Sequence, residues 1–168
     1  MTASRSQALL DAVEQGDASK VRTLLALRTD VNVRDKGGST PLMRASLHGD
    51  LSIVDLLIKE GANLDGRDKI GKTAIHYAAQ EQHSAVVERL IAAGVDVNSQ
   101  DESGNTALSM AVFYSKGAGE TITLLRKKGA DENLPNRHGV TPLALAKTMA
   151  NFDVLKFFDG AEPKVSGH

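Results

Sequence analysis

The eight residues from Gly66 to Thr73 read GRDKIGKT and match the pattern G-x-x-x-x-G-K-T, in which a glycine-rich backbone cradles the phosphates of a nucleotide. A phosphate-binding loop of this kind must follow a buried strand and open a long helix. The preceding residues, Lys59 to Asp65, instead indicate a helix end and a polar turn. No apolar strand that ends in Asp and could hold magnesium is recognisable. Nucleotide binding through Gly66 to Thr73 is therefore the lesser alternative.

The histidines and carboxylates indicate no metal site and no catalytic site. The five histidines include no pair at positions i and i+4, and cysteine is absent, so the ligand clusters typical of zinc are missing. The acidic turn from Asp101 to Gly104 lacks the alternating oxygen ligands of a calcium loop. No nucleophile motif or paired-carboxylate arrangement is recognisable either. We expect no cofactor, no metal and no enzymatic activity.

The composition excludes several classes of protein. The chain carries 20 basic and 21 acidic side chains, so no net charge attracts it to nucleic acid or to an anionic membrane. Cysteine is absent, which excludes disulfides. The apolar runs are too short for a membrane span, and the polar start from Met1 to Gln7 lacks the apolar core of a signal peptide. We expect a cytoplasmic monomer that binds neither nucleic acid nor membrane.

Threonines that start helices recur at a regular spacing. Thr40, Thr73 and Thr106 stand 33 residues apart, and Thr141 follows 35 residues later. Equivalent glycines and alanines accompany them, namely Gly38, Gly71, Gly104 and Gly139 in the turn before each threonine, Ala45, Ala78, Ala111 and Ala146 in the first helix, and Gly61, Gly94 and Gly129 after the second helix. A period of this length indicates a repeated supersecondary unit.

The spacing, with Thr-Pro-Leu at residues 40–42 and 141–143 and Thr-Ala-Ile-His at residues 73–76, resembles the ankyrin repeat family. The resemblance implies an all-α solenoid of stacked helix–turn–helix units with long turns and negligible sheet. It also implies that His76 bonds to the backbone of the neighbouring turn. We expect one domain over residues 6–160, with repeats at about 6–34, 35–67, 68–100, 101–135 and 136–160. Residues 1–5 are expected to be flexible and residues 161–168 disordered.

Departures from the repeat pattern predict two ends and one unusual loop. In the first repeat Lys20 and Thr23 replace apolar residues, as a capping repeat with one face in water requires. In the last repeat Lys147 stands where the third has the small Ala79, so the array is expected to end there. The fourth repeat is two residues longer than the third, and the extra length falls in residues 115–120. Two glycines in this segment predict a mobile loop.

For function, the resemblance implies a non-catalytic scaffold that grips another protein with its turn tips and with the exposed side of the first helices, which line a concave groove. The expected contact residues on the helices are Arg44, Leu47, His48, Tyr77, Gln80, Glu81, Met110, Phe113, Tyr114, Leu145, Thr148 and Met149. At the turn tips they are Lys36, Ser39, Lys69, Ile70, Lys72, Glu102, Asn105, Arg137 and Val140.

Both tyrosines of the chain and one of its four phenylalanines fall on this expected face. Aromatic residues and methionine are enriched at the centres of interfaces, so Tyr77, Met110, Phe113 and Tyr114 are candidates for the main contacts. The alternative is that Tyr77, Met110 and Phe113 only pack against their neighbours. Two versions of the binding function stay open, a general adaptor and an inhibitor or immunity protein that blocks a toxin or an enzyme.

Overall fold

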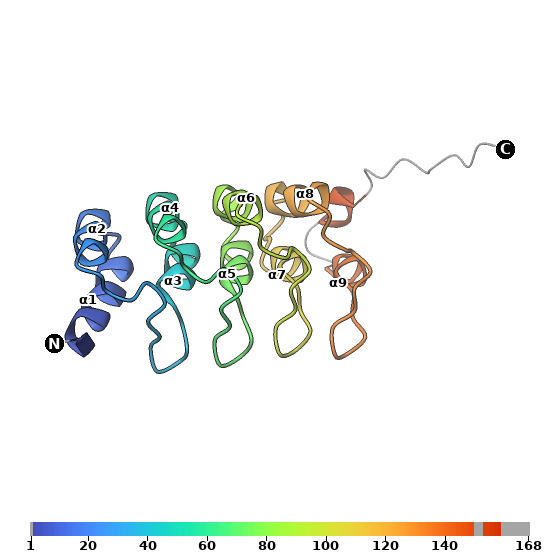
Figure 1. Cartoon of the computed structure of the whole chain (residues 1–168). Coiled ribbons are helices and arrows are strands. Elements are labelled where there is room, and N and C mark those ends of the chain that lie inside the picture. The colour runs from blue at the N-terminus through green and yellow to red at the C-terminus, as the bar shows by residue number, and fades with distance from the viewer. Residues whose placement is uncertain (1, 150–152, 159–168) are drawn as a thin grey trace.

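The computed structural model describes residues 2–149 and 153–158, and Figure 1 shows them as helix pairs stacked in a single row. In this part of the chain all regular structure is helical, and no strand occurs. The elements are α1 (Thr2–Glu14), α2 (Ala18–Ala26), α3 (Pro41–His48), α4 (Leu51–Lys59), α5 (Ala74–Gln80), α6 (Ser84–Ala92), α7 (Ala107–Phe113), α8 (Glu120–Lys127), α9 (Pro142–Thr148) and the 3₁₀ helix η1 (Leu155–Phe157). None of these helices is long and apolar enough to cross a membrane.

Side-chain caps fix the start of both helices in a repeat. The hydroxyl of Thr40 accepts a hydrogen bond from the N–H of Met43, and Pro41 occupies the first helical position, where no backbone donor is needed. The carboxylate of Asp50 caps the second helix of the same repeat by accepting the N–H of Ile53. Gly49 joins the two helices in the left-handed conformation. In the second repeat, residues of the repeat itself therefore set the starts of both helices.

Long turns, here called fingers, precede α3, α5, α7 and α9 and project from the helix layer on one side (Figure 1). Backbone hydrogen bonds of 2.9–3.1 Å join successive fingers, from Lys69 to Gly37, from Glu102 to Ile70 and from Arg137 to Ser103. A Cβ atom on Gly104 would lie 2.8 Å from the N atom of Arg137, so this close approach requires glycine. The fingers thus form one connected row.

The core runs between the helix layers along the whole row. Its fully buried side chains include Ile53, Leu57, Leu90, Ile122 and Leu125 of the second helices. In the first helix of the third repeat, Ala78 and Ala79 are completely buried, and α5 packs against both α3 and α7. Small side chains are needed where three helices meet at short distances.

The two ends differ from the sequence-based expectations. The domain was expected to start at residue 6, whereas α1 begins at Thr2. The last repeat was expected over residues 136–160, and its described part consists of α9 and, in the place of a second helix, the three-residue η1. Lys20, Thr23 and Lys147 are exposed, as the capping argument requires. The tail expected to be disordered, residues 161–168, lies outside the described residues.

Arg126 of α8 connects η1 to the rest of the array. Its guanidinium donates to Glu132 Oε2 at 2.7 Å and to the carbonyl of Phe157 at 2.6 Å, and it lies 5.0 Å from the centre of the Phe158 ring. The ring of Phe157 lies against Gly119, where a Cβ atom would collide with it. The long loop of the fourth repeat therefore receives the C-terminal element.

Candidate functional site

The candidate site is the inner face, which we define as the surface of α3, α5, α7 and α9 next to the fingers (Figure 1). The fourth residue after each helix-starting threonine occupies equivalent places on this face, and these residues are Arg44, Tyr77, Met110 and Leu145. They are polar in the second and third repeats and apolar in the fourth and fifth. The face therefore has two halves of different chemistry.

Ion pairs between neighbouring side chains occupy the N-terminal half of the inner face. Arg44 donates to Glu14 Oε2 at 2.9 Å and to Asp35 Oδ2 at 2.8 Å. Burial opposes the ionisation of Asp35, but the hydrogen bond from Arg44, helped by the N–H groups of Ser39 and Gly37, outweighs burial and holds the pKa of Asp35 below its ordinary value. Glu14, Asp35, Ser39 and Arg44 are among the residues that line a hollow of only about 260 Å³.

The third repeat continues this polar network. The hydroxyl of Tyr77 donates to Asp68 Oδ2 at 2.5 Å, and burial together with this carboxylate raises the pKa of Tyr77. Lys72 Nζ donates to Gln80 Oε1 at 2.7 Å and lies 5.3 Å from the centre of the Tyr77 ring. Asp68, Lys72, Tyr77 and Gln80 are thus already in contact with one another within the chain.

The segment that matches the phosphate-binding pattern is one of the fingers. The N–H groups of Ile70 and Lys72 both donate to Asp68 Oδ1, at 3.0 and 2.9 Å, and the N–H of Gly71 donates to the carbonyl of Asp68. The backbone donors that would face a phosphate are therefore occupied by a carboxylate of the same finger. The helix that follows, α5, has only seven residues. This geometry is unlike a phosphate-binding loop.

The C-terminal half of the inner face is open and apolar. Between α7 and α9 lies a pocket of about 440 Å³. Phe113 is 59 % exposed and Tyr114 40 % exposed, and their rings meet edge to face with 4.9 Å between centres. The residues that line the pocket are Asn105, Ser109, Met110, Phe113, Tyr114, Asn136, His138, Val140, Thr141 and Leu145. We call this hollow the aromatic pocket.

The tips of the last three fingers carry charged side chains. Lys69, Glu102 and Arg137 are all exposed, and within the described residues none of them forms a side-chain hydrogen bond or an ion pair. Ile70 is 53 % exposed at the tip of the finger that precedes α5. These side chains are available to a partner, since no contact within the described chain holds them.

The structure divides the expected contact residues into three groups. The residues that already have a partner within the chain are Arg44, His48, Lys72, Tyr77, Gln80 and Glu81. Among them, Glu81 accepts from Gln80, and His48 lies beside Glu14. Open residues are Lys69, Ile70, Glu102, Phe113, Tyr114 and Arg137, while Asn105, Met110 and Leu145 line the aromatic pocket. Leu47 lies in the small N-terminal hollow, and the hydroxyl of Thr148 donates to the carbonyl of Leu145.

Four further residues that line the pocket were not among the contact residues expected from the sequence, namely Ser109, Asn136, His138 and Thr141. Asn136 carried a usable signal, because it replaces the aspartate that opens the three preceding fingers, at Asp35, Asp68 and Asp101. Ser109 and His138 stand at positions that vary from repeat to repeat, whereas Thr141 is the threonine that starts the first helix of every repeat from the second on and so carries no signal of its own. Their place in a pocket depends on the next repeat, which no local pattern describes.

His76 has the structural role that the repeat pattern implies. It is completely buried, its Nδ1 accepts from the N–H of Thr73 at 3.2 Å, and its Nε2–H donates to the carbonyl of Asn105 at 3.0 Å. Burial lowers the pKa of His76, so the ring is neutral. Within the described residues no three side chains of His, Cys, Asp or Glu come together to hold a metal ion.

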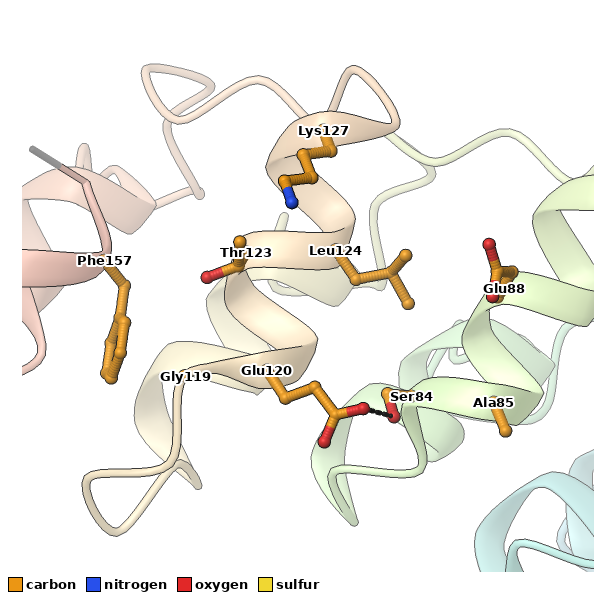
Figure 2. Close-up of a pocket in the computed structure, with 9 residues that line it drawn as sticks. All are labelled: Ser84, Ala85, Glu88, Gly119, Glu120, Thr123, Leu124, Lys127 and Phe157. Carbon is orange, nitrogen blue, oxygen red and sulfur yellow. Dashed lines mark hydrogen bonds between the residues drawn. The ribbon is translucent and has the colours of Figure 1, made fainter. Parts of the chain in front are cut away.

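A second hollow, of about 480 Å³, lies on the opposite side of the molecule around α8 (Figure 2). Its lining residues stand on both sides of that helix, with Phe157 on one side and Ser84 and Glu88 on the other. Ser84 donates to Glu120 Oε1 at 2.6 Å, and Glu88 Oε1 forms an ion pair with Lys128 Nζ at 3.2 Å. Because these polar groups bind one another and do not converge on one point, this hollow is a weaker candidate.

Comparison with known families agrees with the geometry. The family model described as ankyrin repeats, in three copies, matches residues 9–101 and again residues 83–166. The two matches together run from the first repeat to the last, and they confirm both the resemblance and the all-α solenoid. No curated protein matches the chain.

Proposed function

The chain belongs to the ankyrin repeat family, whose repeats generally mediate protein–protein interaction, and from this premise we propose that it is a non-catalytic binding protein. It captures a partner protein on the C-terminal half of its inner face. Phe113 and Tyr114 make the central contacts, and the tips of the last three fingers make the outer ones.

The exposed aromatic pair is the observation that carries this proposal. Six large apolar side chains of the described chain are exposed, and four of them, Ile70, Phe113, Tyr114 and Val140, belong to the inner face or its finger tips. Exposed apolar side chains that gather in one place mark interaction surfaces, whereas scattered ones need no explanation. Binding a partner would remove both rings from water, which favours association by about 25 cal/mol for each Å² of apolar surface buried.

The rigid construction of this region supports the same function. Backbone hydrogen bonds connect the fingers, and Met110, which is 7 % exposed, lines the aromatic pocket together with both rings. A surface that is ordered before binding loses little conformational entropy when the partner docks. The N-terminal half is a poorer site, because a partner would have to break ion pairs such as Arg44 with Asp35.

The test is affinity capture from cells that express the protein, with Phe113→Ala/Tyr114→Ala compared with the wild type. The matched control is Leu27→Ala/Leu51→Ala, which removes two exposed apolar side chains from the second-helix side. We expect one protein that is retained in stoichiometric amount by the wild type and by the control and is lost from the aromatic variant. Circular dichroism and thermal melting should show that all three proteins are folded. Equal retention by the aromatic variant would disprove the site.

A further inference from the structure

One residue opens each finger, and its side chain holds the turn together. These residues are Asp35, Asp68, Asp101 and Asn136. In all four the Oδ1 atom accepts two N–H groups of its own finger, at distances of 2.7–3.0 Å. The Oδ1 atom therefore has the same structural role in every repeat. Only the second terminal atom of the side chain differs from one finger to the next.

In three fingers the chain itself supplies a partner for this second atom. Asp35 Oδ2 accepts from Arg44 at 2.8 Å, and Asp68 Oδ2 accepts from Tyr77 at 2.5 Å. In the last finger, where the equivalent residue is Leu145 and cannot donate, the aspartate is replaced by Asn136. The amide of Asn136 donates to Asn105 Oδ1 at 2.9 Å. The type of finger-opening residue thus follows the hydrogen-bonding capacity of its neighbours.

Asp101 is the exception. The residue equivalent to Arg44 and Tyr77 is Met110, whose thioether has no hydrogen to donate. Within the described part of the chain Asp101 Oδ2 accepts no hydrogen bond and enters no ion pair, and the following carboxylate, Glu102, has no side-chain partner either. Lys72 on the preceding finger is held by Gln80. The finger that precedes α7 therefore has a carboxylate oxygen without a hydrogen-bond donor among the described residues, whereas the equivalent atom of each other finger has a hydrogen-bond partner.

This carboxylate adjoins the aromatic pocket. The N–H of Asp101 donates to the carbonyl of Asn105, and Asn105 and Met110 both line the pocket. A partner that fills the pocket would cover Asp101, and a carboxylate that is removed from water without a partner is costly. A binding segment must therefore carry a donor at this place. The second carboxylate, at Glu102, favours a donor with positive charge.

We propose that the partner protein binds through a segment in which an arginine lies next to an aromatic or large aliphatic residue. This inference rests on the proposed function and specifies the partner's chemistry. The arginine donates to Asp101 Oδ2 and takes the place that Arg44 holds at Asp35 within the second repeat. The neighbouring apolar side chain enters the aromatic pocket against Phe113 and Tyr114. A guanidinium group suits this site because it is always charged and can donate to the one free carboxylate oxygen, as Arg44 does to Asp35 Oδ2.

The probe is a phage-displayed library of random dodecapeptides, selected on the wild-type protein and counter-selected on Phe113→Ala/Tyr114→Ala. Asp101→Asn tests the carboxylate, and its turn should survive because Asn136 already holds the equivalent turn through Oδ1. Asp68→Asn is the control, since it removes the same charge from a carboxylate that Tyr77 occupies. Circular dichroism checks that both variants are folded.

We expect enriched peptides to place arginine beside an aromatic or large aliphatic residue. Asp101→Asn should weaken such peptides about tenfold and Asp68→Asn less than about twofold. Replacing the peptide arginine by alanine should add nothing further in the Asp101→Asn protein, because the two changes remove one interaction. Selected peptides without arginine, or peptides indifferent to Asp101→Asn, would overturn this inference and leave the proposed function standing. Failure to select any peptide that depends on Phe113 and Tyr114 would count against both.

Discussion

At the scale of single residues, the structure separates side chains that hold the array from side chains that are free to bind. His76 belongs to the first kind, because both of its ring nitrogens are used inside the protein. Phe113 belongs to the second, since more than half of its surface is exposed. The residue type alone does not make this distinction. Tyr77 and Tyr114 stand on the same face, yet Asp68 binds only the first.

The neutral state of His76 predicts a stability that depends on pH. Its folded-state pKa is lowered from 6.5, so the unfolded chain binds more protons at acidic pH, and the free energy of unfolding must fall as the pH drops below about 6.5. A single group contributes at most about 1.4 kcal/mol per pH unit. Urea denaturation of the wild type and of His76→Gln at pH 7.5 and 5.5 measures this contribution. We expect a larger loss for the wild type, and an equal loss in both proteins would refute a buried neutral histidine.

At the scale of helices, the short distances between neighbouring helices restrict the size of the side chains that can stand between them. Ala78 and Ala79 are completely buried in α5, between α3 and α7. Either Ala78→Leu or Ala79→Leu should lower the free energy of unfolding by ~1–3 kcal/mol, because the added carbons must displace packed helices. Ala92→Leu, at an exposed position of α6, is the control and should change it little. Chemical denaturation measures the three variants. Unchanged stability in both buried variants would mean that these helix faces are assigned wrongly.

The contact between the long loop and the C-terminal element predicts a second, coupled effect. Gly119→Ala should destabilise the last repeat by ~1–3 kcal/mol, since the new Cβ atom would collide with the ring of Phe157. In a Phe157→Ala background the same change should cost much less, because the ring is gone. A double-mutant cycle by thermal or chemical denaturation measures this coupling. Strictly additive effects would show that the loop and η1 do not meet in solution.

The elements could be predicted from sequence wherever each repeat carries its own signals. Thr40 with Pro41, the glycines of the fingers and the spacing of 33 residues are local features that fix helix starts and turns. The end of the array was less predictable. The short η1 depends on Arg126 and Gly119, which lie about 30 to 40 residues earlier in the chain. The early start of α1 at Thr2 likewise had no cap signal in the sequence.

At the scale of the whole molecule, the chain combines a uniform scaffold with a graded inner face. The scaffold repeats the helix-starting threonine and the backbone contacts between fingers from the second repeat to the last. The face changes from ion pairs around Arg44 to the aromatic pocket around Phe113. The sequence predicted a set of contact residues for this face, and their role in binding stays a prediction. It could not show which of these side chains would be occupied by contacts within the chain. That depends on contacts between repeats, such as the ion pair of Arg44 with Glu14.

The most direct test of the account compares the two halves of the inner face in one binding measurement. Isothermal titration calorimetry of the captured partner gives the dissociation constant for the wild type, for Phe113→Ala and for Arg44→Ala, with folding verified for each protein. A central aromatic contact contributes about 2 kcal/mol or more, so Phe113→Ala should weaken binding by roughly 30-fold. Arg44→Ala should weaken it less than about threefold, because this guanidinium is already bound within the chain. The reverse order, with Arg44 dominant and Phe113 neutral, would contradict the account.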